Sequence, residues 1–111
     1  MVSGLQELHA QTGKDILFTE VGFKSHPDAA IEPWAWPQDT QSSTVDQTYQ
    51  ANCYRAVLQA TGQMEGFAGL FWWKWFTDLN DVHTDTPEEG PHGFTPQGKL
   101  AEEVLREAWS P

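Results

Sequence analysis

The sequence has little positive charge and no long apolar run. Its 111 residues include 6 Lys and Arg against 16 Asp and Glu, a formal net charge of -10. That excess of negative charge opposes binding to a phosphate backbone or an anionic membrane, so neither nucleic acid nor membrane is an expected partner. No stretch reaches the roughly 18 apolar residues of a membrane-spanning helix, and the N-terminus lacks the basic and apolar regions of a signal peptide. We therefore expect a cytoplasmic location.

Cysteine and paired histidines, which would build disulfides or metal sites, are also scarce. Cys53 is the only cysteine, so an intrachain disulfide is excluded, and its place in an apolar helical stripe indicates a core role. The histidines, at positions 9, 26, 83 and 92, show no paired ligand spacing. We expect no metal and no cofactor.

Aromatic residues, in contrast, are abundant: six Trp, six Phe and two Tyr. Two interpretations remain open. The tryptophans could fill a core, or they could line a cleft in which flat-faced ligands such as sugars stack. Because Trp34, Trp36, Trp73 and Trp75 cluster near the expected ends of strands, the pattern favours the cleft.

Hydrophobic spacing and turn residues predict a single unit of alternating helices and strands. Thr44 and Gln47 form a capping box, and Gly62 is the expected end of that helix. Prolines interrupt both long connections. The predicted elements are helix 3–11, strand 15–21, loop 22–43, helix 44–61, strand 66–76, loop 77–98 and helix 99–109.

The two strands and the helix between them predict a right-handed βαβ unit, with both strand ends at the same sheet edge. Glu20 stands near the end of the first strand and is expected near Trp75 at the end of the second. A carboxylate at a strand end is either an ion-pair partner, here of Lys74, or a working group at the mouth of a site.

Four segments in this order carry a family resemblance. They are Ile16-Leu17-Phe18-Thr19-Glu20-Val21-Gly22-Phe23-Lys24-Ser25, Pro33-Trp34-Ala35-Trp36, Gly69-Leu70-Phe71-Trp72-Trp73-Lys74-Trp75 and Phe94-Thr95-Pro96-Gln97-Gly98-Lys99-Leu100-Ala101-Glu102. Together they resemble the last part of a clan A glycoside hydrolase, and the closest family is the β-mannanase-like glycoside hydrolase family 113.

The resemblance implies an α/β fold, a partial (β/α)8 (TIM) barrel with two parallel strands, the seventh and eighth, three helices and two long βα loops. It implies that Glu20 is the nucleophile of a retaining hydrolase that acts on β-mannan or a related β-linked oligosaccharide or polysaccharide. Trp73 or Trp75 would form the floor of the subsite at the cleavage point, and Trp34 and Trp36 would line neighbouring subsites.

Two features of the family pattern are missing. Such a barrel takes roughly 250 residues, and the acid/base Glu of its fourth strand, which usually follows an Asn, has no counterpart here because the sequence contains no Asn-Glu pair. The chain alone is therefore expected to be inactive. Its expected protein partner is a second copy, forming a homo-oligomer, or a complementing N-terminal barrel segment. The alternative is a non-catalytic module that binds carbohydrate or self-associates.

Overall fold

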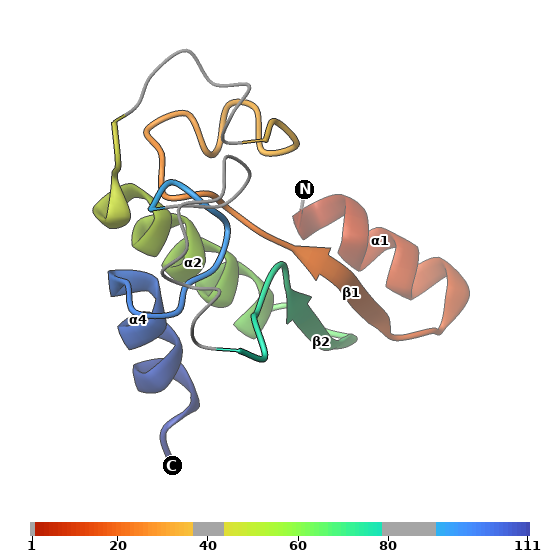
Figure 1. Ribbon diagram of the computed structural model, residues 1–111. Coiled ribbons are helices and arrows are strands. Elements are labelled where there is room, and N and C mark those ends of the chain that lie inside the picture. The colour runs from red at the N-terminus through yellow and green to blue at the C-terminus, as the bar shows by residue number, and fades with distance from the viewer. Residues whose placement is uncertain (1, 37–43, 79–90) are drawn as a thin grey trace.

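The computed structural model describes residues 2–36, 44–78 and 91–111, and its element order is the predicted one (Figure 1). Of the two predicted loops, residues 37–43 and 79–90 lie outside the described residues. The chain is an α/β unit of two parallel strands and three helices. The elements are α1 (Val2–Thr12), β1 (Ile16–Val21), α2 (Gln47–Gly62), β2 (Phe67–Trp72) and α4 (Leu100–Trp109).

The sheet consists of β1 and β2, paired in parallel from Ile16 opposite Phe67 to Val21 opposite Trp72. At its far end the Trp73 amide donates to the Val21 carbonyl at 2.6 Å. Both strands therefore end at the same edge, the edge at which parallel α/β proteins place their binding sites.

The second strand is shorter than the predicted span of 66–76, because β2 ends at Trp72. The reason is the length of β1, which stops at Val21 and offers no further ladder partner. Beyond Trp73 the backbone is held by a side chain instead, since the Gln97 amide accepts from the Phe76 N–H at 2.7 Å and donates to the Phe76 carbonyl at 3.0 Å.

Helix α2 begins at Gln47 and not at Thr44, so the predicted capping box is wrong. The cap is Asp46, whose carboxylate accepts from the Tyr49 amide at 2.8 Å. Asp is at least as effective an N-cap as Thr, and it satisfies one of the free amides of the first turn.

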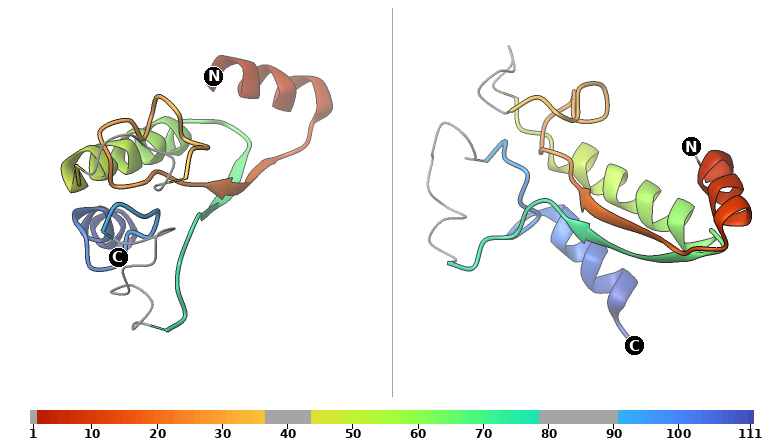
Figure 2. Two further views of the ribbon diagram at one scale, coloured as in Figure 1. Left: turned by 45° about the horizontal axis from the view of Figure 1, so that its top comes forward. Right: turned by 90° about the vertical axis from the view of Figure 1, so that its right-hand side faces the viewer.

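The core lies between α2 and α4, which run side by side, and the end of β2 packs against it (Figures 1 and 2). Tyr54 of α2 is completely buried and stacks on Trp72 of β2, with ring centroids 4.0 Å apart and planes 8° apart. The buried cluster is Ala51, Tyr54, Ala101, Val104 and Leu105, with Phe23, Leu58 and Trp72 packed against it.

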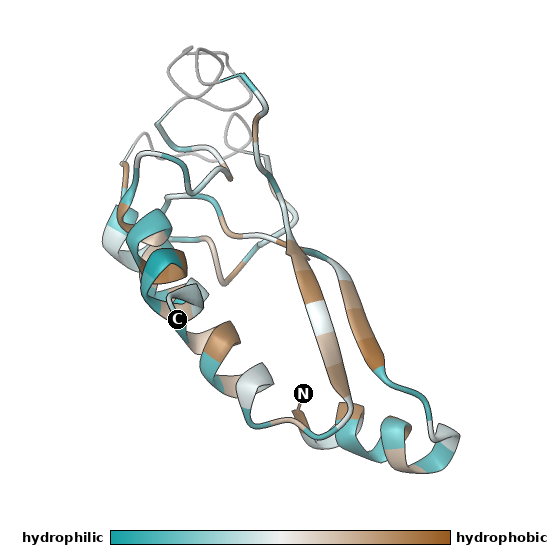
Figure 3. Cartoon of the chain, turned by 90° about the horizontal axis from the view of Figure 1, so that it is seen from below, coloured by the Kyte–Doolittle hydropathy of each residue, from teal (hydrophilic) through white to brown (hydrophobic). Residues whose placement is uncertain are grey.

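Much apolar surface remains uncovered. Helix α1 has no buried residue and lies beyond β1, on the side away from α4 (Figure 1). Hydrophobic residues run along both strands (Figure 3), and among them Leu17 is 50% and Phe71 62% exposed. Exposed apolar area of this kind is typical of surfaces that contact another segment or chain.

Candidate functional site

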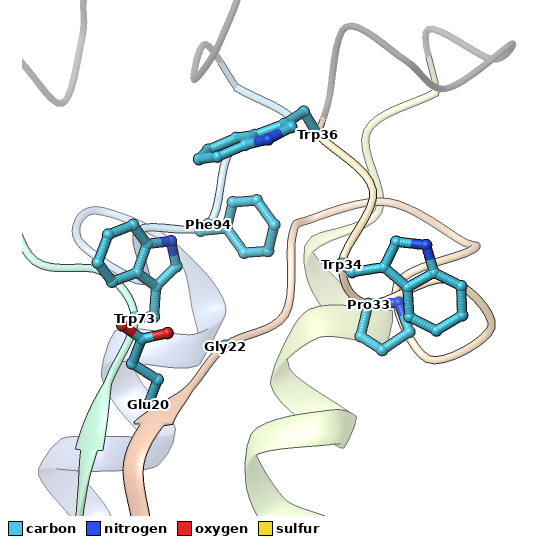
Figure 4. Close-up of a pocket in the computed structure, with 7 residues that line it drawn as sticks. All are labelled: Glu20, Gly22, Pro33, Trp34, Trp36, Trp73 and Phe94. Atoms are coloured by element: carbon cyan, nitrogen blue, oxygen red, sulfur yellow. The ribbon is translucent and has the colours of Figure 1, made fainter.

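A pocket of about 300 Å3 lies where the two strands end (Figure 4). Glu20 and Trp73 lie together on one side of it, and Trp34 with Pro33 lies on the other. The lining residues are Glu20, Gly22, Pro33, Trp34, Trp36, Trp73 and Phe94. Four of the five predicted site residues therefore share one pocket.

The Glu20 carboxylate is the acidic group of this lining, and it is solvent-exposed. No salt bridge joins it to Lys74 in the part of the chain that the structure describes. The Lys74 ammonium instead lies over the rings of Phe76, at 4.9 Å from the centroid, and Trp73, at 5.8 Å. The ion-pair interpretation of Glu20 thus has no support in the geometry.

Trp73 follows directly after β2 and packs against the backbone beyond Glu20. A Cβ on Gly22 would collide with the Trp73 carbonyl oxygen and would lie 3.1 Å from the Trp73 Cβ. Only glycine permits this approach. The peptide bond between Trp73 and Lys74 is cis. The indole keeps 39% of its surface exposed, at the edge of the pocket that Glu20 enters.

Trp36 and Phe94 bring together the loops that follow the two strands. Their rings meet edge to face, with centroids 5.9 Å apart. Gln50 of α2 supports both loops, because its buried amide nitrogen donates to the carbonyl of Phe23 at 2.9 Å and to that of Phe94 at 3.3 Å. A rigid helix thus fixes the backbone from which this wall of the pocket rises.

The loop after β1 is tied to the segment before α4 by a second buried group, Ser25. Its hydroxyl donates to the Pro91 carbonyl at 2.6 Å and accepts from the Lys99 ammonium at 3.0 Å. Lys99 also donates to the Gly93 carbonyl at 2.9 Å. Residues distant in sequence are therefore fixed next to each other behind the pocket.

Trp75 lies elsewhere, contrary to the expectation that it stands beside Glu20. Because β2 ends at Trp72, the strand alternation that would put Trp75 on the same face as Trp73 does not extend to it. Trp75 lines a separate pocket of about 450 Å3 beside α4. The residues that line it are Trp75, Glu102, Leu105, Arg106, Trp109 and Ser110.

Sequence reasoning had not assigned Gly22, Pro33 or Phe94 to the site. Pro33 and Phe94 belong to the segments that carry the family resemblance, but loop residues have no periodic pattern that predicts which way they point. Gly22 has a signal, its position two residues after the strand-end carboxylate, where a close backbone approach calls for glycine.

No group of three or more His, Cys, Asp or Glu side chains suited to a metal ion occurs among the described residues; His83 lies outside them. His26 is fully buried, and its Nδ1 accepts from the Asp28 amide at 3.1 Å. Burial raises the pKa of the Cys53 thiol, which makes it a poor nucleophile. Within residues 2–36, 44–78 and 91–111, no helix combines the length and apolar character needed to cross a membrane.

Two parallel strands with a carboxylate and several indoles around the pocket at their C-terminal edge define an α/β protein with a candidate site at that edge. Comparison with protein families makes the class specific. The family described as Glycoside Hydrolase Family 113 matches residues 1–99. The chain belongs to glycoside hydrolase family 113.

Solved structures give the same relation. The chain is similar to a structure titled "Complex structure of GH113 beta-1,4-mannanase", with a TM-score of 0.73 and 22% identity, and to one titled "Structure of GH113 beta-1,4-mannanase", with 0.72 and 23%. Both alignments cover 96% of this chain and 33% of the mannanase, so this chain has the fold of one third of that barrel. A search of curated proteins finds no match.

Proposed function

We propose that this chain is the C-terminal segment of a retaining glycoside hydrolase that acts on β-mannan or a related β-linked polysaccharide. Its strands would be the seventh and eighth of a (β/α)8 barrel. One observation carries the proposal: the Glu20 carboxylate lines the same pocket as Trp34, Trp36 and Trp73. Membership of family 113 and the likeness to β-1,4-mannanases supply the reaction class and the substrate class.

In this proposal Glu20 attacks the anomeric carbon of the bound sugar and forms a covalent glycosyl-enzyme, which water then hydrolyses. The Trp73 indole stacks on the sugar next to the cleaved bond, and its π face stabilises the positive charge of the oxocarbenium-like transition state. Trp73 takes this role in preference to Trp75 because it shares the pocket with Glu20.

The described residues offer no second carboxyl group beside Glu20, so in this proposal it comes from the rest of the barrel. A retaining hydrolase needs an acid/base about 5–5.5 Å from its nucleophile, and Glu20 is the sole carboxylate in the described lining of the pocket. The chain spans about a third of the mannanases it resembles. The remaining strands of the barrel would supply the acid/base, and Trp34 and Trp36 would hold sugar units further along the chain.

A trapping experiment tests the nucleophile. This chain is mixed with the N-terminal two thirds of a family 113 mannanase and treated with an activated 2-deoxy-2-fluoro-mannoside, whose glycosyl-enzyme turns over slowly. We expect mass spectrometry to place the label on Glu20. Glu20→Gln should abolish labelling and lower hydrolysis of manno-oligosaccharides by about 10³-fold or more.

Glu32→Gln is the control, because Glu32 is an exposed carboxylate on the loop that follows β1 and is absent from the pocket lining. This variant should label and hydrolyse as the parent does. Labelling of another residue, or equal activity in the Glu20 and Glu32 variants, would rule out the proposed role of Glu20.

A second candidate function is a non-catalytic module that binds carbohydrate or associates through its sheet. The exposure of Phe71 on β2 and of Trp109 on α4, 62% and 61%, favours it. Titration of the chain with manno-oligosaccharides, followed by tryptophan fluorescence, separates the two forms of this module. A fluorescence change with sugar, without hydrolysis by the chain alone or mixed with the N-terminal segment, indicates a binding module. No fluorescence change at millimolar sugar indicates a module that only associates with another chain.

A further inference from the structure

Lys24 has an unusual environment for a lysine, because its side chain is completely buried beneath the loop that follows β1. Lysine is rarely buried unless its ammonium group is paired. Here burial lowers the pKa of Lys24, while the nearby carboxylates of Asp28 and Glu32 act in the opposite direction. A cation held in such a place calls for a structural or functional explanation.

The contacts of the ammonium group supply one. Lys24 Nζ donates to the carbonyl oxygens of Glu32 and Ala35, each at 3.0 Å. These two carbonyls flank Pro33 and Trp34, and the Ala35 amide donates to the Glu32 carbonyl at 3.0 Å, closing a turn. Lys24 therefore holds both ends of a turn that carries Trp34.

Trp34 depends on that turn more than its neighbour Trp36 does. The Trp34 side chain is 75% exposed and has no hydrogen bond or aromatic partner among the described residues, whereas Trp36 packs edge-on against Phe94. In Figure 4 the Trp34 ring stands beside Pro33, away from the rings of Trp36 and Phe94. The position of the Trp34 ring is thus set chiefly by its backbone.

The backbone from which the Lys24 side chain extends is held firmly in place. Ser25, next to Lys24, is fully buried and bonded to the Pro91 carbonyl and the Lys99 ammonium. The Ser25 carbonyl accepts from the Asp46 amide at 2.9 Å, which connects this backbone to the cap of α2. Because its backbone is anchored in this way, the Lys24 side chain can fix the turn 32–35 relative to the rest of the fold.

We propose that Lys24 is a positioning residue, which holds the turn 32–35 so that Trp34 is presented as a ready-made stacking surface for a sugar unit of a β-linked chain. The inference rests on the proposed function of the pocket. A pre-ordered indole saves the cost of immobilising that side chain when the sugar binds. Loss of the clamp should therefore weaken oligosaccharide binding and leave the core intact.

The variant for the test is Lys24→Met, which keeps most of the side-chain volume and removes both the donor and the buried charge. The chain is labelled with 5-fluorotryptophan, and the Trp34 fluorine signal is assigned by Trp34→Phe. We expect Lys24→Met to shift or broaden the Trp34 signal and to leave those of Trp72 and Trp109 unchanged. Lys24→Arg, which retains several donors, should restore it in part.

Binding is measured on the same samples with mannohexaose. Lys24→Met should raise the Kd about 2- to 10-fold, the effect of one newly disordered side chain. The control is Lys14→Gln, which removes an exposed ammonium outside the pocket and should change neither the signal nor the Kd. Should Lys24→Met fail to fold, as a lost Trp72 signal would reveal, Lys24→Leu gives the same comparison, because it too removes the donor and the charge.

An unchanged Trp34 signal in Lys24→Met would overturn the inference, and so would an unchanged Kd in a chain that binds the sugar. Another pair of results would contradict the proposed function and leave the role of Lys24 standing. If the parent chain, alone and mixed with the N-terminal barrel segment, binds no manno-oligosaccharide while the Trp34 signal still responds to Lys24→Met, the clamp exists and the pocket does not take this sugar.

Discussion

The carbonyl oxygen of Trp73 occupies the space that a Cβ on Gly22 would need. Glu20 precedes Gly22 by two residues on β1, and Trp73 is the first residue beyond β2. The amide of Trp73 donates to Val21, which lies between Glu20 and Gly22. The contact therefore fixes the spacing between the proposed nucleophile and the proposed stacking surface.

Gly22→Ala tests this contact. The added methyl group must displace the Trp73 backbone, and overpacking of this kind costs about 1–3 kcal/mol. For a domain of this size we expect Tm to fall by about 4–20 °C, and binding of manno-oligosaccharide to weaken. The control is Gly4→Ala in α1, where a Cβ meets nothing within 4 Å. Equal Tm values for parent and Gly22→Ala would contradict the close approach.

The order of elements and the place of Glu20 could be predicted from sequence because they depend on local patterns. Gly13 and Gly62 mark helix ends, and the apolar run before Glu20 has the length of a strand. The end of β2 could not be predicted, since it depends on where its partner strand stops. The nearly continuous run of apolar residues through Trp75, broken only by Lys74, gave no sign of that boundary or of the separation of Trp73 from Trp75.

The inward face of α4 was likewise only partly predictable. Helical spacing predicts that Leu100, Val104, Leu105 and Ala108 face inward. Val104 and Leu105 do, but Leu100 is 48% exposed, Ala108 is exposed, and Ala101 is buried instead. The first turn of a helix lies at the edge of its packing partner, so size alone does not decide burial there. The clamp formed by Lys24 had no sequence signal, because lysine in a loop is normally solvated.

Gln97→Leu should loosen the segment between β2 and α4. Gln97 is 5% exposed and is bonded to both backbone groups of Phe76 and to the Thr95 hydroxyl, which donates to it at 2.9 Å. Leucine would leave these groups unpaired, at a cost of about 1–3 kcal/mol. Chemical denaturation measures the loss. Gln11→Leu, at an exposed site in α1, is the control, and a loss of similar size there would refute this role of Gln97.

Tyr54→Phe should be tolerated and should alter the response to high pH. The buried hydroxyl has no hydrogen-bond partner among the described residues, so its removal should leave the free energy of unfolding equal or higher, by up to about 1–3 kcal/mol. Burial raises the pKa of Tyr54 above its ordinary value of about 10. The unfolded chain therefore loses this proton first as pH rises, and the native state loses stability above about pH 10.

Unfolding measured between pH 8 and 11 should show a smaller alkaline loss for Tyr54→Phe than for the parent. Tyr49→Phe, which removes a hydroxyl from a half-buried position on the same helix, provides the comparison. If the free energy of unfolding falls equally with pH in the parent and in Tyr54→Phe, the buried phenol does not cause the loss of stability at high pH.

Phe71→Thr should weaken self-association of the isolated chain. Phe71 lies on β2 with 62% of its surface exposed, and an apolar sheet with unpaired edges favours contact with another sheet. Burying a Phe side chain contributes about 1.5–3 kcal/mol, so its loss should raise the dissociation constant about tenfold or more. Thr retains strand propensity, which separates the lost contact from a lost strand.

Sedimentation at several chain concentrations measures the change, and Ile31→Thr is the matched control. Ile31 is an apolar residue with a similar exposure, 68%, but it lies in the loop after β1, away from the sheet. If association is equally weakened by both variants, surface hydrophobicity and not the sheet is responsible. A parent chain that stays monomeric at every concentration would show that the exposed strands are stable without a second copy. Competition by an N-terminal barrel segment would show that this segment and a second copy contact the same surface.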